Sequence, residues 1–426
     1  MQASAHTVTA LVRDQWGRAL ATLVSDFGDL SLAEDALQDA FMAALQRWPQ
    51  DGQPRSPLAW LLTVARRRAI DHLRHEQQKI AKQTELGILA DQREVFPAVE
   101  EEELIPDERL RLIFTCCHPA LRPSAQVALT LKTLCGFRTS ELARAFLSAE
   151  TTMGQRIVRA KRKIRDAGIP YRVPDPEQLP ERLHSVLAVI YLIFNESWSA
   201  TGGDQLIRQA LYAEALNLVG LLQQLMRPDS EVLGLHALML LHGSRSKARL
   251  ESGNELVTLE EQDRCLWDRA MIDAGQRLIV EAAALGPPGP YLLQAMISAV
   301  HAEAASFEET DWGQIRDLYG LLYTAQPSLV IKLNAAVARY FAGETTAAVA
   351  IFDELEQEPS LARYQPLYAA RAELCRKAGE FSKARDYALR ALALCQNDTE
   401  CRYLQKRLRQ IDAAAGAVES MPEGRR

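Results

Sequence analysis

The sequence feature that most constrains the fold of this chain is a pair of short predicted helices, separated by turns and followed by a strongly basic helix. Residues 124–134 carry apolar side chains at helical spacing, and Gly136 is a natural left-handed end to that helix. Thr139 or Ser140 can cap a second, short helix, and Ser148 can cap a third. The third helix has six Lys or Arg and no acid from Arg156 to Arg165. This arrangement predicts a helix-turn-helix unit, in which the last helix enters the major groove of DNA.

The basic helix divides into a buried stripe and a DNA-facing side. Met153, Ile157, Ala160 and Ile164 recur at helical period and are predicted to face the core. The other faces carry small polar side chains first, suited to base edges, and then cations, suited to phosphates. These expected contacts are Thr151, Thr152, Gln155, Arg156, Arg159 and Arg162. Alternatively, an isolated basic run is only a solvated surface helix.

The net charge of −6 argues by itself against a nucleic-acid-binding protein, but the charges are unevenly distributed. Basic residues concentrate at 66–82 and 156–172, and acids dominate between them. The N-terminus has no secretory apolar region, and the longest apolar run, Val186 to Phe194, is about half of what a membrane span needs. We therefore expect a cytoplasmic protein that contacts no membrane.

Cysteine usage indicates a reducing compartment and no metal site. The seven cysteines show no C-x-x-C spacing. Cys116, Cys117 and His118 are adjacent, but neighbouring helical side chains point in different directions and no second ligand pair accompanies them. We expect neither a metal nor a cofactor.

The first 76 residues have a charge pattern of their own. Residues 8–27 and the segment from Leu32 to Leu45 are amphipathic helices, and the second carries an acidic and amide face opposite its apolar one. That face consists of Glu34, Asp35, Gln38 and Asp39. A third helix runs from Trp60 to Arg74, and its stripe of Arg67, Asp71 and Arg74 cannot be core.

These segments resemble a known family. Residues 33–41 and 59–74 resemble conserved region two of the bacterial extracytoplasmic-function (ECF) RNA polymerase sigma factors, and the helix-turn-helix at 124–165 resembles their region four. The family usually has Ala-Arg-Asn-Arg where this chain has Ala65-Arg66-Arg67-Arg68, so Arg67 replaces an Asn that contacts promoter DNA.

The resemblance implies a role for each surface. The face of Glu34, Asp35, Gln38 and Asp39 would dock on a basic coiled coil of core RNA polymerase. Arg66, Arg67, Asp71 and Arg74 would bind the minus-ten element and its unstacked strand. The six polar and basic residues of the 148–165 helix would bind double-stranded promoter DNA at the minus-thirty-five element.

The predicted fold class is all-α, with two small helical sigma domains followed by an α-helical, tetratricopeptide-like C-terminal domain. We expect a region-two domain at 1–76, an acidic flexible linker at 77–106, a region-four domain at 107–174 and a helical extension at 181–426. Within the extension Gly343 and Gly379 lie 36 residues apart in similar contexts, close to the tetratricopeptide period of about 34 residues, which places repeats near 327–412.

In the stretches 191–196, 260–267, 289–295 and 310–312, the extension resembles the one carried by a subset of ECF sigma factors. Because it is covalently tethered across residues 175–180, we expect regulation in cis, with a regulatory protein or ligand as a possible partner. Its polar residues form no phosphate loop, nucleophile elbow or metal spacing, so we expect structural roles and no enzyme activity. These residues are Asn195, Glu196, Asp263, Arg264, His301, Asp311 and Trp312.

The sequence therefore predicts a sigma factor that directs core RNA polymerase to specific promoters. One alternative is a free-standing helix-turn-helix regulator whose helical repeats sense a ligand or peptide. Another is an interaction scaffold with incidental basic helices. The acidic face at 34–39 favours the sigma factor, because a free regulator does not need it.

Overall fold

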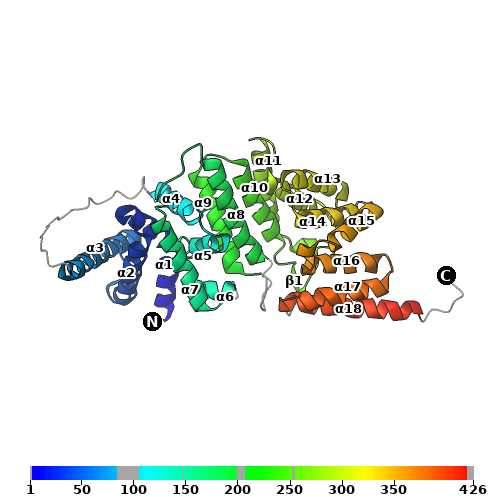
Figure 1. The fold of residues 1–426 in the computed structure, drawn as a ribbon, viewed down its shortest axis with the longest axis horizontal. Helices are drawn as coiled ribbons and strands as arrows, with labels where there is room; N and C mark the ends of the chain where they lie inside the picture. Colours follow the sequence, from blue (N-terminus) through cyan, green and yellow to red (C-terminus); the bar gives the residue numbers. More distant parts are fainter. Residues whose placement is uncertain (1, 84–104, 147, 199–206, 252–254, 420–426) are drawn as a thin grey trace. The chain divides into compact units, whose positions relative to one another are not determined.

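The computed structural model describes residues 2–83, 105–146, 148–198, 207–251 and 255–419, and the chain divides into two compact units, Met1–Ile190 and Tyr191–Arg426. The described residues are helical apart from turns and one short antiparallel hairpin, β1 (Leu250–Glu251) with β2 (Glu255–Leu256), in which Leu250 pairs with Leu256 (Figure 1). The predicted all-α fold is confirmed.

Unit 1 is built from helices that cover both predicted DNA-binding regions. In chain order they are α1 (Gln2–Phe27), α2 (Leu30–Asp51), α3 (Pro57–Gln83), α4 (Ile105–Cys116), α5 (Pro123–Thr133), α6 (Thr139–Ala145), α7 (Glu150–Asp166) and the first turns of α8 (Leu179–Trp198). Helix α3 continues into the stretch predicted as a linker, and residues 84–104 of that stretch lie outside the described residues.

The first three helices pack around a small apolar core. Leu20 of α1, Leu37 of α2 and Leu61 of α3 are fully buried, and Trp16 stacks on Phe41 with ring centroids 5.3 Å apart. Helix α2 begins where the Asp29 carboxylate accepts hydrogen bonds from two backbone N–H groups, which satisfies donors that a helix start leaves unpaired. Burial of these side chains fixes the outer face of α3.

Helices α5 to α7 form the predicted helix-turn-helix. Gly136 follows α5 with φ of +67°, the left-handed conformation expected of a glycine stop. A Cβ atom at this position would lie only 3.2 Å from the Trp16 ring, which gives a second reason for glycine. The expected Ser148 cap is wrong: α7 begins one residue later, with Ala149 at the N-cap and no side-chain cap.

The two predicted DNA-binding regions pack against each other within unit 1. Helix α1 contacts α4 and α5, and a Cβ on Gly17 would come within 2.5 Å of the Leu134 carbonyl oxygen. The Tyr171 hydroxyl lies 2.9 Å from the Ala21 carbonyl oxygen and 3.0 Å from that of Glu108. The region that follows residue 105 therefore packs on the first three helices, and we call this arrangement of unit 1 the closed form.

Unit 2 is a succession of helices. After the end of α8 they are α9 (Gln209–Leu225), α10 (Ser230–Ser244), the short η1 (Arg264–Leu266), α11 (Arg269–Ala283), α12 (Pro290–Glu303), α13 (Trp312–Ala325), α14 (Leu329–Phe341), α15 (Thr345–Glu356), η2 (Pro359–Leu361), α16 (Gln365–Lys377), α17 (Phe381–Leu394) and α18 (Asp398–Glu419). Helix α14 packs on α15, α16 on α17 and α17 on α18. No helix among the described residues is long and apolar enough to cross a membrane.

The repeat found in the sequence is present in the backbone. Gly343 between α14 and α15 has φ of +88°, and Gly379 between α16 and α17 has φ of +76°. The residue after each glycine donates the same backbone hydrogen bond of 2.9 Å, Glu344 to Arg339 and Glu380 to Cys375. The two helix pairs are thus equivalent hairpins, and their assignment as tetratricopeptide-like repeats stays a prediction.

Candidate nucleic-acid and polymerase interfaces

Helix α7 presents the predicted division between core and solvent. Met153, Ile157 and Ala160 are buried, while Ile164 keeps partial exposure. On the other faces Thr151, Thr152, Gln155, Arg159 and Arg162 are exposed and Arg156 is half-buried. Arg162 makes an exposed ion pair of 3.2 Å with Asp166.

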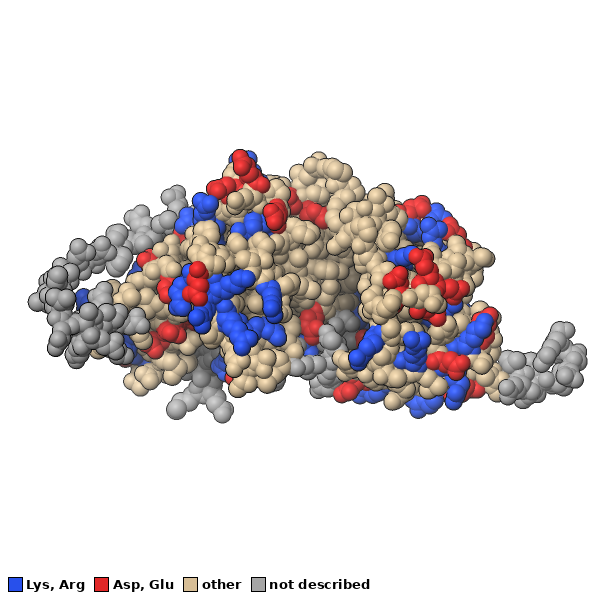
Figure 2. All heavy atoms as spheres, in the orientation of Figure 1, with Lys and Arg blue, Asp and Glu red and all other residues tan. Residues whose placement is uncertain are grey.

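Cations dominate the outer side of this helix, and Figure 2 shows Lys and Arg side chains gathered over α7. The surface therefore combines small polar groups at the helix start with a cationic field further along. These are the two components that base reading and phosphate binding need.

Helix α3 presents a second, narrower row of charge. Arg67, Asp71 and Arg74 are exposed on its outer side, as expected from their spacing. Arg66 is half-buried, and its Nε atom donates to the Asp26 carboxylate of α1 at 2.8 Å. Arg66 therefore orients α3 on α1 and is less accessible than its neighbour Arg67.

The acidic face of α2 is only partly exposed. Asp35 and Gln38 are exposed, and Asp39 is half-buried with its Oδ2 atom 3.8 Å from Nε2 of His72. Partial burial raises the pKa of Asp35, the Lys161 charge opposes this, and the Glu34 charge adds to it. These three side chains form the accessible part of the predicted docking face.

Glu34 differs from the expectation of an exposed carboxylate, because it is 3% exposed. Its Oε1 atom lies 3.2 Å from Nζ of Lys132 in α5 and accepts from Gln38 at 3.1 Å, and its Oε2 atom accepts from Nζ of Lys161 in α7. Burial alone raises the pKa of Glu34, but the charges and hydrogen bonds of Lys161 and Lys132 outweigh it and leave the pKa lowered.

The lysine contacts to Glu34 were not predicted. Lys161 looks like one more phosphate-binding cation of the basic helix, and Lys132 sits among the residues of an ordinary amphipathic helix. No periodicity relates them to Glu34, since Lys161 is 127 positions away. Together the three side chains tie α2 to the helix-turn-helix, and we call them the Glu34 cluster.

The adjacent Cys116 and Cys117 are buried, and their sulfur atoms lie near threonine hydroxyls, Thr133 at 3.1 Å and Thr130 at 3.5 Å. Burial raises the pKa of Cys116, and it raises that of Cys117 to about 12, so both thiols stay protonated at neutral pH. Within the described residues, no group of three His, Cys, Asp or Glu side chains could hold a metal ion.

The polar residues singled out in the extension form caps and inter-helix contacts. Asp263 and Asp311 accept backbone N–H groups at the starts of η1 and α13. Glu196 pairs with Arg208 at 2.5 Å, and Arg264 donates to the carbonyl oxygens of His301 and Ala304. These contacts support the structural roles expected for them.

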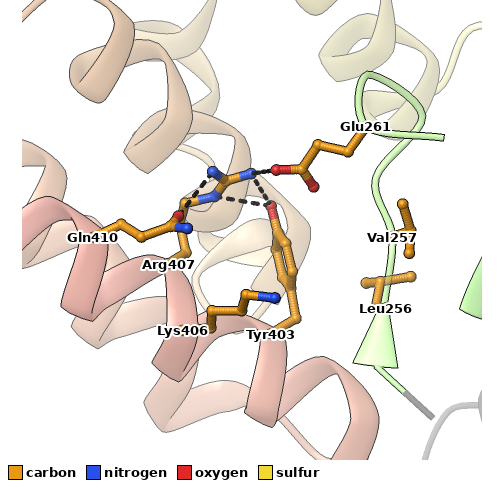
Figure 3. Close-up of a pocket in the computed structure, with 7 residues that line it drawn as sticks. All are labelled: Leu256, Val257, Glu261, Tyr403, Lys406, Arg407 and Gln410. Carbon is orange, nitrogen blue, oxygen red and sulfur yellow. Dashed lines mark hydrogen bonds and ion pairs between the residues drawn. The ribbon is translucent and has the colours of Figure 1, made fainter. Parts of the chain in front are cut away.

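One pocket of unit 2, of about 270 Å³, separates the segment after the hairpin from α18 (Figure 3). Arg407 crosses it and donates to the Gln410 amide oxygen at 3.0 Å, the Tyr403 hydroxyl at 3.0 Å and the Glu261 carboxylate at 3.1 Å. The full lining is Leu256, Val257, Glu261, Tyr403, Lys406, Arg407 and Gln410. Because its guanidinium is engaged on several sides, Arg407 serves to join this segment to α18.

Comparison with known proteins identifies two regions of the chain that match known families. The chain matches the Sigma-70 region 2 family over residues 13–79, and a family of unknown function, DUF6596, over residues 182–283. It is 39% identical over 403 residues to uncharacterized protein R00370 of Rhizobium meliloti (strain 1021). This alignment covers 94% of this chain and 95% of that protein.

More distant relatives align over 139 residues. The chain is 27% identical to ECF RNA polymerase sigma factor SigK of Mycobacterium ulcerans (strain Agy99) and 28% identical to SigK of Mycobacterium tuberculosis (strain ATCC 25618 / H37Rv). Each alignment covers 32% of this chain and 73% of the relative. No solved structure matches the chain.

Proposed function

Since the chain belongs to the ECF sigma factors and carries a long helical C-terminal extension, we propose that it binds core RNA polymerase and directs it to specific promoters. The observation that carries the proposal is α7, which buries one apolar stripe and presents Thr151, Thr152 and Gln155 ahead of its exposed cations. The protein itself performs no chemistry in this role.

At the minus-thirty-five element, the first turns of α7 read base edges and the later ones hold the backbone. Thr151, Thr152, Gln155 and Arg156 lie in the turns that a recognition helix places in the groove. Arg159 and Arg162 lie further along, where cations contact phosphates and orient the helix without reading sequence.

At the minus-ten element, α3 contributes the exposed row of Arg67, Asp71 and Arg74. Opened DNA needs cations for its backbone, and Arg67 and Arg74 supply them. Arg66 acts differently, because its bond to Asp26 makes it a positioning residue for α3.

Docking on core polymerase uses Asp35, Gln38 and Asp39 directly. Glu34 becomes available only when α7 and α5 move away, since both lysines of the Glu34 cluster come from the helix-turn-helix. The closed unit 1 is therefore a resting form, and polymerase binding separates the two DNA-binding regions. Their separation also frees Lys161 for DNA.

Run-off transcription with purified core polymerase tests the central claim. Full-length protein should yield promoter-specific transcripts, and Thr151→Ala with Gln155→Ala should change which minus-thirty-five sequences are used. If the protein fails to bind core polymerase but still binds DNA specifically, it is a free-standing regulator and the sigma-factor role is refuted.

Regulation in cis by unit 2 is the second part of the proposal, motivated by its covalent attachment through α8. A protease site introduced at the exposed residues 175–178, directly ahead of α8, allows the tether to be cut after folding. Transcription is then compared before and after cleavage, with size-exclusion chromatography to confirm that the parts have separated. Equal transcription from separated parts would show that the extension has no effect on initiation.

A further inference from the structure

Two arginines of unit 2, Arg245 and Arg249, lie against one tryptophan ring. The guanidinium carbon of Arg249 is 4.7 Å from the centroid of the Trp198 ring, and that of Arg245 is 5.6 Å from it. Trp198 is buried and packs on Phe194 and His242, with centroids 6.4 and 5.4 Å away. The two arginine-to-ring distances lie within the range of cation–π attraction, so the Trp198 ring holds two positive charges close together.

Among the described residues, neither arginine has a carboxylate partner. Among the residues that the structure describes, no Asp or Glu oxygen lies within 4.0 Å of either guanidinium, and the buried Nε of Arg249 has no hydrogen-bond partner. Arg245 donates to Nδ1 of His242 at 3.3 Å. Burial, with the nearby Arg245 and Arg249 charges, lowers the pKa of His242 well below its usual range, so this imidazole is neutral and offers no compensating charge.

The two cations destabilise each other in this environment. Burial and the neighbouring Arg249 charge lower the pKa of Arg245 to about 9. Burial lowers the pKa of Arg249 to about 10, and the Glu400 carboxylate acts in the opposite direction. Both groups are still charged at neutral pH. Buried charges are normally paired, because an unpaired one loses its hydration without compensation.

Other half-buried arginines of unit 2 follow that rule. Arg208 pairs with Glu196 at 2.5 Å, Arg371 with Glu356 at 3.0 Å and Arg407 with Glu261 at 3.1 Å. Arg264 is buried without a carboxylate within 4.0 Å among the described residues, but it donates instead to two backbone carbonyl oxygens, those of His301 and Ala304. A charge-compensating acceptor is therefore the usual partner of a buried arginine in the described part of this unit.

We propose that Arg245, Arg249 and Trp198 form a binding site for the oxyanion group, carboxylate or phosphate, of a small molecule. A guanidinium presents a planar fork of N–H donors that matches both groups. Bound between the two arginines, an oxyanion accepts from the unpaired Nε and neutralises the repulsion between them. Tyr319, which stays protonated because burial raises its pKa to about 12, interacts electrostatically with Arg245 and is a candidate additional donor.

This site goes beyond the proposed promoter role and does not depend on it, because its test uses neither DNA nor polymerase. A site of this kind gives the extension a chemical input. It also defines the ligand by charge and shape, since a neutral molecule gains nothing from the two guanidiniums.

Isothermal titration calorimetry on the full-length protein tests the site, with inorganic phosphate and citrate as separate probes at an ionic strength held constant with sodium chloride. Binding of phosphate alone, citrate alone or both supports the proposal and distinguishes the two sources of the oxyanion. Arg249→Gln should weaken that binding by about tenfold to a hundredfold, the loss expected for a charged hydrogen bond. Lys247→Gln is the matched control, because Lys247 is exposed in the same turn, and should bind as the native protein does.

The unliganded stability gives an independent readout. Because Arg249→Gln removes one of two like charges, the thermal midpoint of the unliganded variant should stay the same or rise, whereas removal of a structural arginine lowers it. If this variant does not fold, Arg245→Lys keeps the charge but loses the planar fork, and it should also weaken binding. Absence of binding to both probes, undiminished binding in the variants, or a lower unliganded midpoint for Arg249→Gln would overturn the proposal.

Discussion

Replacing Lys161 by Met should destabilise the closed form of unit 1 and at the same time strengthen binding to core polymerase. Lys161 donates to the buried Glu34 carboxylate, and its own side chain is only 15% exposed. Met keeps an apolar stem of similar length and removes only the charged donor. The substitution therefore isolates the ionic contact between α2 and α7.

The structure sets the size of the effect. A hydrogen bond to a charged group contributes about 1.5–3 kcal/mol, and Glu34 retains Lys132 at 3.2 Å when Lys161 is lost. We therefore expect the free energy of unfolding of unit 1 to fall by about 1.5 kcal/mol, near the lower end of that range. If polymerase binds only the open form, the same free energy favours opening, and the apparent affinity for core polymerase rises about tenfold.

Stability is measured by urea unfolding monitored by tryptophan fluorescence, and affinity by titrating labelled core polymerase with the protein. Lys163→Met is the matched control, because Lys163 lies on the same helix, carries the same charge and is exposed. It removes one positive charge from α7 without touching Glu34, so both quantities should stay near the native values.

The pH dependence provides a second check with a defined sign. The folded pKa of Glu34 is lowered from its usual 4.5, so its contribution to stability is complete above about pH 4.5 and is lost as the pH falls through the lower folded value. This loss should be smaller in Lys161→Met. Equal stability of the Lys161 and Lys163 variants, or a core affinity that does not rise in Lys161→Met, would refute the reasoning.

Other predictions concern DNA reading and the helical repeats. Arg156→Ala should reduce the free energy of DNA binding by about 1–3 kcal/mol and relax the preference at one base position. Arg162→Ala should weaken binding equally on all sequences and reduce the slope of log affinity against log salt concentration by about one. Both effects are measured by fluorescence anisotropy on promoter variants. Gly379→Ala should destabilise unit 2 by about 1–2 kcal/mol because its φ is +76°, whereas Gly416→Ala, inside α18 with open space around it, should stabilise it by about 0.5–1 kcal/mol in urea unfolding. Arg407→Met should lower the free energy of unfolding of unit 2 by about 1.5–3 kcal/mol and increase the rate of backbone hydrogen exchange near β2. Unchanged exchange there would contradict the role of Arg407 in joining this segment to α18.

Local residue patterns are enough to predict the helices and turns and much of the orientation of each helix. Apolar residues at helical spacing predicted the buried stripe of α7, and three of its four members are buried. Gly136, Gly343 and Gly379 marked turns, and all three have the positive φ that an L side chain rarely adopts. These features depend on a few neighbouring residues, and for that reason a single sequence reveals them.

Which charged side chains are exposed for binding depends on how the helices pack. Glu34, Arg66 and the arginines at 245 and 249 look like surface charges in the sequence. The fold buries Glu34 against Lys161, pairs Arg66 with Asp26, and gives Arg245 and Arg249 no carboxylate partner among the residues that the structure describes. Ion pairs and desolvation depend on atoms brought together from distant positions, and no local pattern encodes them. The helices of this protein are thus local properties, whereas the availability of its binding groups depends on how those helices pack.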